Sequence, residues 1–128
     1  MAVKSYFFDT YALHEILEGN PNYLKYAEDV GIITTKLNLM EIYYDYLSKK
    51  GRVVAEKIYS YLKNSAIDLD DDLIKEAMNF RLEIKTKNPK SNVSYADAVG
   101  YIAAKRNMVK FLTGDREFGD LDNVEFVK

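Results

Sequence analysis

Short apolar runs alternate with longer segments of helical periodicity along the whole chain. The first run, residues 4–8, shows no alternation of polar and apolar positions, which is typical of a strand buried on both faces. The run that follows it, residues 31–35, is rich in β-branched residues. Together with three later runs, these segments predict strands at 4–8, 31–35, 66–69, 109–113 and 124–127.

Helices are predicted between these strands. The helical segments are 11–18, 22–29, 36–49, 52–64, 70–85 and 95–107, with a short helical piece at 116–118. Strands that alternate with helices from end to end indicate a mostly parallel sheet covered by helices on both faces. At 128 residues the chain fits a single domain, 1–128. We therefore expect an α/β fold, a three-layer α/β/α sandwich with a mostly parallel central sheet of about five strands.

Carboxylates follow two of the predicted strands directly. Asp9 comes after the strand at 4–8, and Asp115 comes two residues after the strand at 109–113. Ligands of such sheets bind outside the carboxyl ends of the strands, so both residues fall on the functional edge. Each also has a structural explanation, because Asp9 is a good helix N-cap and Asp115 fits a turn or the cap of 116–118.

Glu41 is expected to border the buried face of its helix. The apolar stripe expected to face the core consists of Leu37, Met40, Tyr44 and Leu47. With ~3.6 residues per turn, Glu41 lies one turn after the first of them. A carboxylate there costs on the order of several kcal/mol unless it is paired or bound to a cation. The alternatives are that Glu41 reaches solvent at the edge of the stripe or pairs with a lysine.

Asp97 lies in the first turn of the helix at 95–107. Ser94 and Asp97 fit a capping box, which is a structural role compatible with metal binding. The small residues Ala96, Gly100 and Ala104 form a stripe that lets this helix pack close to the sheet. Close packing would bring Asp97 to the strand ends.

The combination of four carboxylates suggests a metal site. Carboxylates within a few ångströms of one another either protonate or bind divalent cations. The chain has no cysteine, and we interpret its single histidine, His14, as structural. Oxygen ligands without Cys or His favour Mg²⁺ or Mn²⁺ over Zn²⁺.

Composition narrows the choice of partners and compartment. The net charge of −2 and the pI of about 5.4 argue against broad electrostatic capture of nucleic acid. They leave room for an enzyme that recruits phosphates through bound cations. The apolar runs are much shorter than the roughly 20 residues of a membrane span, and no signal peptide is recognised. We expect a cytoplasmic protein without membrane contact.

Four short motifs occur in order along the chain. They are Phe7-Phe8-Asp9-Thr10, Glu41 within a helix after an apolar strand, Ser94-Tyr95-Ala96-Asp97-Ala98, and Leu112-Thr113-Gly114-Asp115-Arg116-Glu117-Phe118. The ordered set resembles the PIN domain family, and in detail the small VapC-type toxins of toxin–antitoxin pairs.

The resemblance implies a metal-dependent ribonuclease. Asp9, Glu41, Asp97 and Asp115 would be the catalytic residues and hold Mg²⁺ or Mn²⁺. Supporting roles would fall to Thr10 and Thr113, at positions where hydroxyls often assist in that family, and to Ser94. The substrate would be RNA, and an antitoxin protein would be a partner.

Contacts to RNA and to other proteins are less defined. Substrate phosphates could be held by Lys85, Lys87, Lys90 and Arg116, although a solvated loop fits the three lysines equally well. Tyrosines crowd the hairpin at 36–64 beyond what one core-facing stripe can absorb, which suggests a homodimer or antitoxin contact there. Three alternatives stay open: an RNA-processing nuclease without an antitoxin, a non-catalytic PIN-like binding module, and, with less resemblance, a receiver-type signalling domain.

Overall fold

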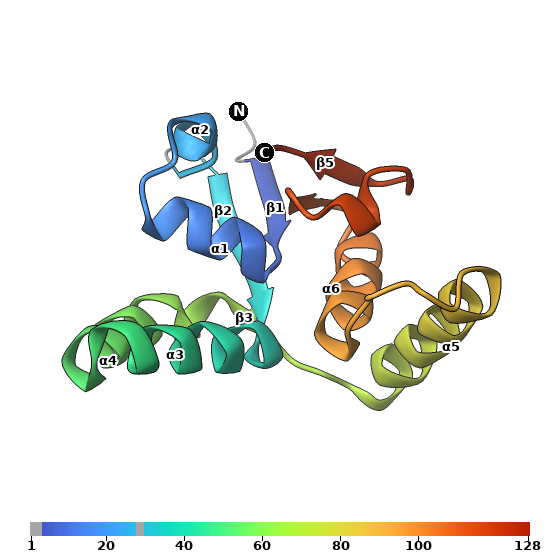
Figure 1. Cartoon of the computed structure of the whole chain (residues 1–128), viewed down its shortest axis with the longest axis horizontal. Helices are drawn as coiled ribbons and strands as arrows, with labels where there is room; N and C mark the ends of the chain where they lie inside the picture. The colour runs from blue at the N-terminus through green and yellow to red at the C-terminus, as the bar shows by residue number, and fades with distance from the viewer. Residues whose placement is uncertain (1–3, 28–29) are drawn as a thin grey trace.

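The central sheet has five strands, all in parallel. The computed structural model describes residues 4–27 and 30–128, and its sheet has the order β3-β2-β1-β4-β5. Every pairing between neighbouring strands is parallel, which confirms the predicted α/β class (Figure 1). The strands are β1 (Lys4–Phe8), β2 (Val30–Thr35), β3 (Ala66–Ile67), β4 (Lys110–Thr113) and β5 (Val124–Phe126).

The helices lie within a few residues of their predicted positions. The predicted helix at 22–29 is replaced by a 3₁₀ turn, Pro21–Tyr23, and a short α2; residues 28 and 29 lie outside the described residues. Further 3₁₀ turns cover Lys63–Ser65 and Arg116–Phe118. The α-helices are α1 (Thr10–Leu17), α2 (Leu24–Ala27), α3 (Lys36–Lys50), α4 (Arg52–Leu62), α5 (Asp71–Lys87) and α6 (Tyr95–Arg106).

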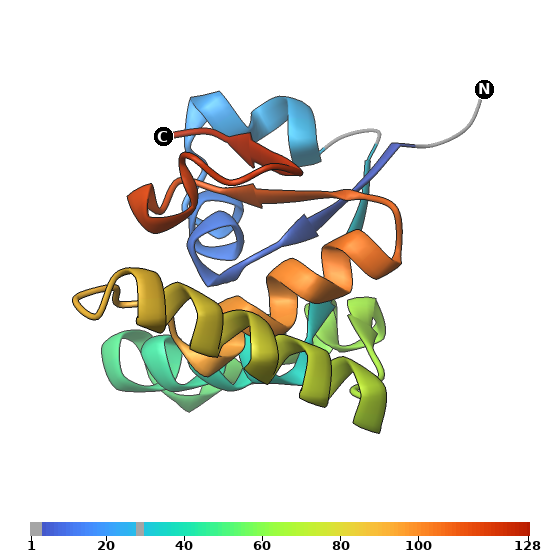
Figure 2. The ribbon, with the colours of Figure 1, turned by 90° about the vertical axis from the view of Figure 1, so that its right-hand side faces the viewer.

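Helices cover both faces of the sheet. Successive residues of a strand point to opposite faces, and Phe7 and Phe8 of β1 accordingly enter two separate cores. Phe7 packs with residues of α5 and α6, whereas Phe8 packs with residues of α1, α3 and α4. Figure 2 views the molecule from the side of α5 and α6. The three-layer arrangement is as predicted.

The close packing of α6 on the sheet depends on one glycine. A Cβ atom added at Gly100 would lie 2.7 Å from Cε1 of Phe7, a distance that real side chains essentially never adopt. Ala96 and Ala104, one turn to either side, are buried as well. The predicted stripe of small residues therefore allows α6 to approach β1, and it carries Asp97 toward the strand ends.

The predicted core-facing stripe of α3 is wrong except at Leu37, which is partly buried and packs against the core. Met40 and Tyr44 are 62% and 69% exposed, and the residues that face the core are Asn38, Leu39, Ile42 and Tyr46. The reason is that α3 packs against α1, α4 and β2, and these neighbours select the other of two apolar stripes. Glu41 is nevertheless half-buried, because it follows Asn38 by one turn and precedes buried Ile42.

None of the described helices combines the length and the apolar character that crossing a membrane requires.

Candidate active site

The candidate site lies at the point in the sheet where the order of strand addition reverses. From β1 the chain builds β2 and β3 on one side, and it later adds β4 and β5 on the other side. The carboxyl ends of β1 and β4 therefore flank a topological switch point, the usual ligand site of open α/β sheets. Asp9 follows β1 and Thr113 ends β4, and the Thr113 hydroxyl donates a hydrogen bond to Oδ2 of Asp9.

Asp9 is a helix cap and a buried acid at the same time. Its Oδ1 accepts a hydrogen bond from the Ala12 amide at 2.7 Å, so the predicted N-cap role is confirmed. The side chain is only 2% exposed. Burial is the main cause that raises the pKa of Asp9, and the nearby charges of Asp97 and Asp115 act in the same direction. The two hydrogen bonds lower the pKa, and the net value is about 7.

Asp97 forms the predicted capping box with Ser94. The Ser94 amide donates to Oδ2 of Asp97, the Asp97 amide donates to Oγ of Ser94, and both distances are 3.0 Å. This geometry leaves Oδ1 of Asp97 for another partner. Burial is the main cause that raises the pKa of Asp97, and the charges of Asp115 and Glu41 act in the same direction.

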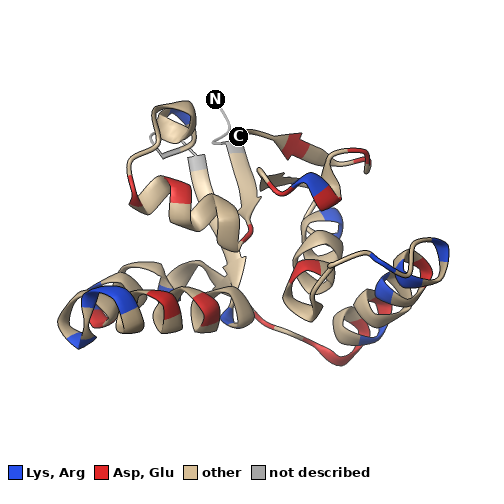
Figure 3. Cartoon of the chain, in the orientation of Figure 1, with Lys and Arg blue, Asp and Glu red and all other residues tan. Residues whose placement is uncertain are grey.

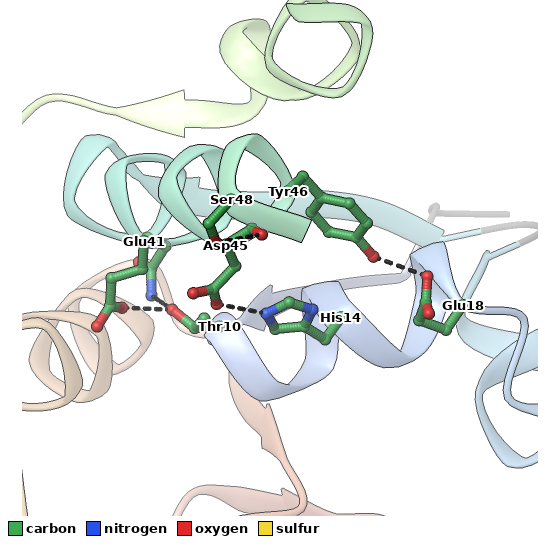
Figure 4. Close-up of polar contacts among 8 residues, drawn as sticks. Thr10, His14, Glu18, Glu41, Asp45, Tyr46 and Ser48 are labelled. Carbon is green, nitrogen blue, oxygen red and sulfur yellow. Dashed lines mark hydrogen bonds and ion pairs between the residues drawn. The ribbon is translucent and has the colours of Figure 1, made fainter. Parts of the chain in front are cut away.

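Glu41 reaches toward the start of α1. Its Oε1 accepts a hydrogen bond of 2.5 Å from Oγ1 of Thr10, the residue directly after Asp9 (Figure 4). Among the ion pairs of the described residues none includes Glu41, so pairing with a lysine is not observed there. The Thr10 contact points Glu41 toward the carboxyl end of β1.

Asp115 lies at the mouth of an open hollow beside the 3₁₀ turn. Its Oδ1 accepts from the Glu117 amide at 2.9 Å, and its own amide donates to Oγ1 of Thr113 at 3.0 Å. Asp115 therefore caps this turn, which confirms the predicted cap of 116–118. The hollow is also lined by Asn88, Asn92, Arg116, Glu117 and Asp120.

Asp97 lies within range of the charges of the other three carboxylates, but the four do not form a closed cage. Asp97 and Asp115 both raise the pKa of Asp9, and Glu41 and Asp115 both raise the pKa of Asp97. In the described part of the chain, no group of three His, Cys, Asp or Glu side chains is arranged to hold a metal ion. The chemistry of the set still fits a hard divalent cation, because it offers only carboxylate oxygens and two of the acids are destabilised as anions.

The candidate phosphate-binding residues occupy different environments. The ammonium group of Lys85 donates to the carbonyl oxygens of Ser91 at 2.7 Å and Pro89 at 3.2 Å, so it fixes the loop before α6. Lys87, the last residue of α5, and Lys90, on that loop, are exposed, and Arg116 lines the hollow next to Asp115. Figure 3 shows Lys and Arg along α5 and at the α3–α4 turn. A role of these side chains in RNA binding stays a prediction.

His14 lies in the seam between α1 and α3, away from strand ends. Its Nε2 pairs with Oδ2 of Asp45 at 2.8 Å, and its ring stacks on Tyr46 (Figure 4). The Tyr46 hydroxyl donates to Glu18 at 2.9 Å. This pair joins the two helices one turn beyond the Thr10–Glu41 contact, which agrees with the structural role expected for His14.

Sequence reasoning missed Asn38 and Thr35. Asn38 is 1% exposed, and its Nδ2 donates to Oγ1 of Thr10 at 3.1 Å. Thr35 caps α3 and donates to Oδ1 of Asn38 at 2.7 Å. The available signal was an asparagine one helical turn before Glu41, on the same side of the helix.

Comparisons with known proteins agree on the fold. A family model described as PIN domain matches residues 6–124. A chain of a toxin–antitoxin complex from Klebsiella pneumoniae is 16% identical with a TM-score of 0.74, over 94% of this chain and 95% of that chain. A chain from the structure described as VapBC2 from Rickettsia felis bound to a DNA fragment from their promoter is 16% identical. Its TM-score is 0.73, and the match covers 97% of this chain and 99% of that chain. PAE2754 from Pyrobaculum aerophilum is 20% identical with a TM-score of 0.63, and the match covers 98% of this chain and 92% of that chain. Among curated proteins, no sequence match was found.

Proposed function

The chain belongs to the PIN domain family, and we propose that it is a divalent-metal-dependent endoribonuclease that hydrolyses phosphodiester bonds of RNA. One observation carries the proposal. Asp9, Glu41, Asp97 and Asp115 come from four separate segments, and the pKa values of Asp9 and Asp97 respond to the other acids across the switch point. Such mutual repulsion supports a site built for a cation.

The residues of this chain would have distinct roles at this site. The four carboxylates would hold Mg²⁺ or Mn²⁺, and Thr10 and Thr113 would orient Glu41 and Asp9 through their hydroxyl groups. When bound, the cation supplies Lewis-acid chemistry and positive charge for the scissile phosphate. Asp9, with its raised pKa of about 7, would give up its proton as the cation binds.

We further propose that the protein is the toxin of a toxin–antitoxin pair and that it forms a homodimer. Two chains of the same fold come from structures described as a toxin–antitoxin complex and as VapBC2. The α3–α4 hairpin exposes Tyr44 by 69% and Tyr61 by 66%, and exposed tyrosines are typical of protein interfaces. A small reading frame directly upstream, whose product co-purifies with this chain, would support the pairing.

Cleavage of a defined RNA tests the enzymatic proposal. Purified protein with Mn²⁺ is expected to cut an end-labelled RNA internally, and EDTA is expected to stop the reaction. Asp97→Asn is expected to lower the rate by at least ~100-fold with the fold intact, because it removes a ligand charge. The matched control is Asp71→Asn, an exposed acid in the first turn of α5. Equal cleavage by wild type and Asp97→Asn would indicate a contaminating nuclease and contradict the proposal.

A second readout is independent of the RNA sequence. Mn²⁺ is expected to raise the melting temperature of the wild-type protein by mass action, and to raise that of Asp97→Asn much less. The corresponding increase in the free energy of unfolding should reach about 2.7 kcal/mol when the free Mn²⁺ concentration is about one hundred times the dissociation constant. The same increase in both proteins would place the bound cation elsewhere.

A further inference from the structure

A partly buried hydrogen-bond chain leads from the start of α3 to Glu41. The hydroxyl of Thr35 donates to Oδ1 of Asn38 at 2.7 Å, and Nδ2 of Asn38 donates to Oγ1 of Thr10 at 3.1 Å. The hydroxyl of Thr10 then donates to Oε1 of Glu41 at 2.5 Å. Thr35 and Asn38 are 0% and 1% exposed, so water does not compete for the contact between them, whereas Thr10 and Glu41 are half-buried.

The chain of donors has one direction. A carboxylate only accepts hydrogen bonds, so the single proton of the Thr10 hydroxyl is required at Glu41. The Thr10 oxygen must therefore accept from Asn38, which places the NH₂ group of the amide toward Thr10. The amide oxygen is then left for the Thr35 hydroxyl, and each group in the chain has one role.

We propose that Asn38 is a positioning residue that fixes the Glu41 carboxylate through Thr10. The inference rests on the proposed function in one respect, that Glu41 is a ligand of the cation. With Oε1 held by Thr10, Oε2 of Glu41 is directed to the site. Because Thr10 directly follows Asp9, the same contact sets the distance between these two acids.

A metal-free measurement tests the chain without reference to catalysis. In ¹⁵N-labelled protein, the side-chain NH₂ signals of Asn38 are identified by their loss in Asn38→Leu, or in Asn38→Ser if the leucine variant does not fold. These signals are expected to shift in Glu41→Gln, because the change reaches Asn38 through the Thr10 hydroxyl. The matched control is Glu56→Gln, since Glu56 also accepts from a hydroxyl, that of Tyr43, but on the hairpin surface. Unshifted signals in Glu41→Gln would overturn the proposal.

A double-mutant cycle tests the consequence for the site. Asn38→Leu and Thr10→Val are each expected to lower kcat, and to raise the Mn²⁺ concentration for half-maximal thermal stabilisation, by ~10- to 100-fold, as outer-shell changes do. KM for RNA should stay within about twofold. The double variant should be no worse than Thr10→Val alone, because Asn38 acts through Thr10. Thr34→Val, which removes a buried hydroxyl that donates to the Phe8 carbonyl, should change kcat by less than about threefold.

The outcomes separate this inference from the proposed function. Losses that multiply in the double variant, or a folded Asn38→Leu with full kcat and full Mn²⁺ affinity, overturn the positioning role while the ribonuclease stands. A wild-type protein that cleaves no RNA overturns the ribonuclease, and the role of Asn38 is then decided by the NMR shift and the Mn²⁺ midpoint.

Discussion

In the metal-free protein, the surroundings of Asp9 act on its pKa in two opposite directions. As the N-cap of α1 it accepts hydrogen bonds that favour the anion, while its burial and the neighbouring acids disfavour the anion. Burial has the larger effect, since the pKa is raised overall from 3.8 to about 7. The folded protein therefore binds a proton at pH values where the unfolded chain has already released it.

This difference predicts that the stability of the metal-free protein falls as pH rises. The contribution of Asp9 is fully present below about pH 4, the pKa of an unfolded aspartate, and is lost as pH rises through about 7. Asp97 contributes with the same sign, because its pKa is raised as well. Asp9→Asn should flatten the dependence and, at about pH 8, raise the melting temperature by on the order of 5 °C. Thermal melts of both proteins in EDTA between about pH 5 and about pH 8 measure this dependence of stability on pH.

The control for this experiment is again the exposed acid Asp71. Asp71→Asn should leave the slope of stability against pH unchanged. A slope that persists undiminished in Asp9→Asn would mean that Asp9 is ionised in the folded protein at low pH, contrary to its burial.

At the scale of elements, the approach of α6 to β1 decides whether Asp97 reaches the site. Gly100 faces the Phe7 ring, and the capping box at Ser94 fixes the first turn of the same helix. A helix displaced from the sheet would carry Asp97 with it. Packing and the candidate chemistry are therefore coupled along one helix.

Gly100→Ala is expected to destabilise the protein by about 1–3 kcal/mol, because the added methyl group would overlap the Phe7 ring. The shift of Asp97 should also weaken Mn²⁺ binding. Urea denaturation and the Mn²⁺-dependent melting temperature measure the two effects. Gly119→Ala serves as the matched control, since a Cβ there meets its nearest atom at 3.4 Å, an ordinary contact. Equal stability of the two variants would contradict the proposed close packing.

Local signals predicted most elements and the places of three of the four acids relative to them. Ser94 and Asp97 define the start of α6, and Asp9 and Asp115 follow from the rule that ligands gather at strand ends. The orientation of α3 could not be predicted, because its two apolar stripes are equally plausible until α1 and α4 pack against it. Asn38 was missed for the same reason: its partner, Thr10, lies 28 residues earlier in the chain.

At the scale of the whole molecule, the α3–α4 hairpin, at the lower left of Figure 1, exposes several apolar side chains. Met40 and Tyr44 on α3 and Val53 and Tyr61 on α4 are each more than 60% exposed, with values of 62%, 69%, 69% and 66%. Burying such residues against a partner would be favourable. Met40 and Tyr44 flank Glu41 on α3, so a partner bound to this surface would lie beside the proposed cation site.

Tyr44→Ser combined with Tyr61→Ser is expected to weaken self-association or antitoxin binding by at least ~10-fold, as loss of interface tyrosines does. The melting temperature of the monomer should change little, because both side chains are exposed. Size-exclusion chromatography with light scattering over a concentration series measures the association. Tyr95→Ser is the control, since Tyr95 is 64% exposed on α6. A wild-type protein that stays monomeric at micromolar concentration, without a bound peptide, would count against this surface.

The position of β1 in the sheet has a consequence for how the protein is made. β1 lies in the centre of the sheet and is the first of the described strands to be synthesised, but its neighbour β4 begins at Lys110, so one edge of β1 stays unpaired until β4 has been made. Pairing over such a sequence separation is slow. A nascent chain with only Asp9 and Glu41 outside the exit tunnel would have half of its acids. The proposed nuclease would therefore stay inactive during synthesis until Asp97 and Asp115 have also emerged and β4 has paired with β1.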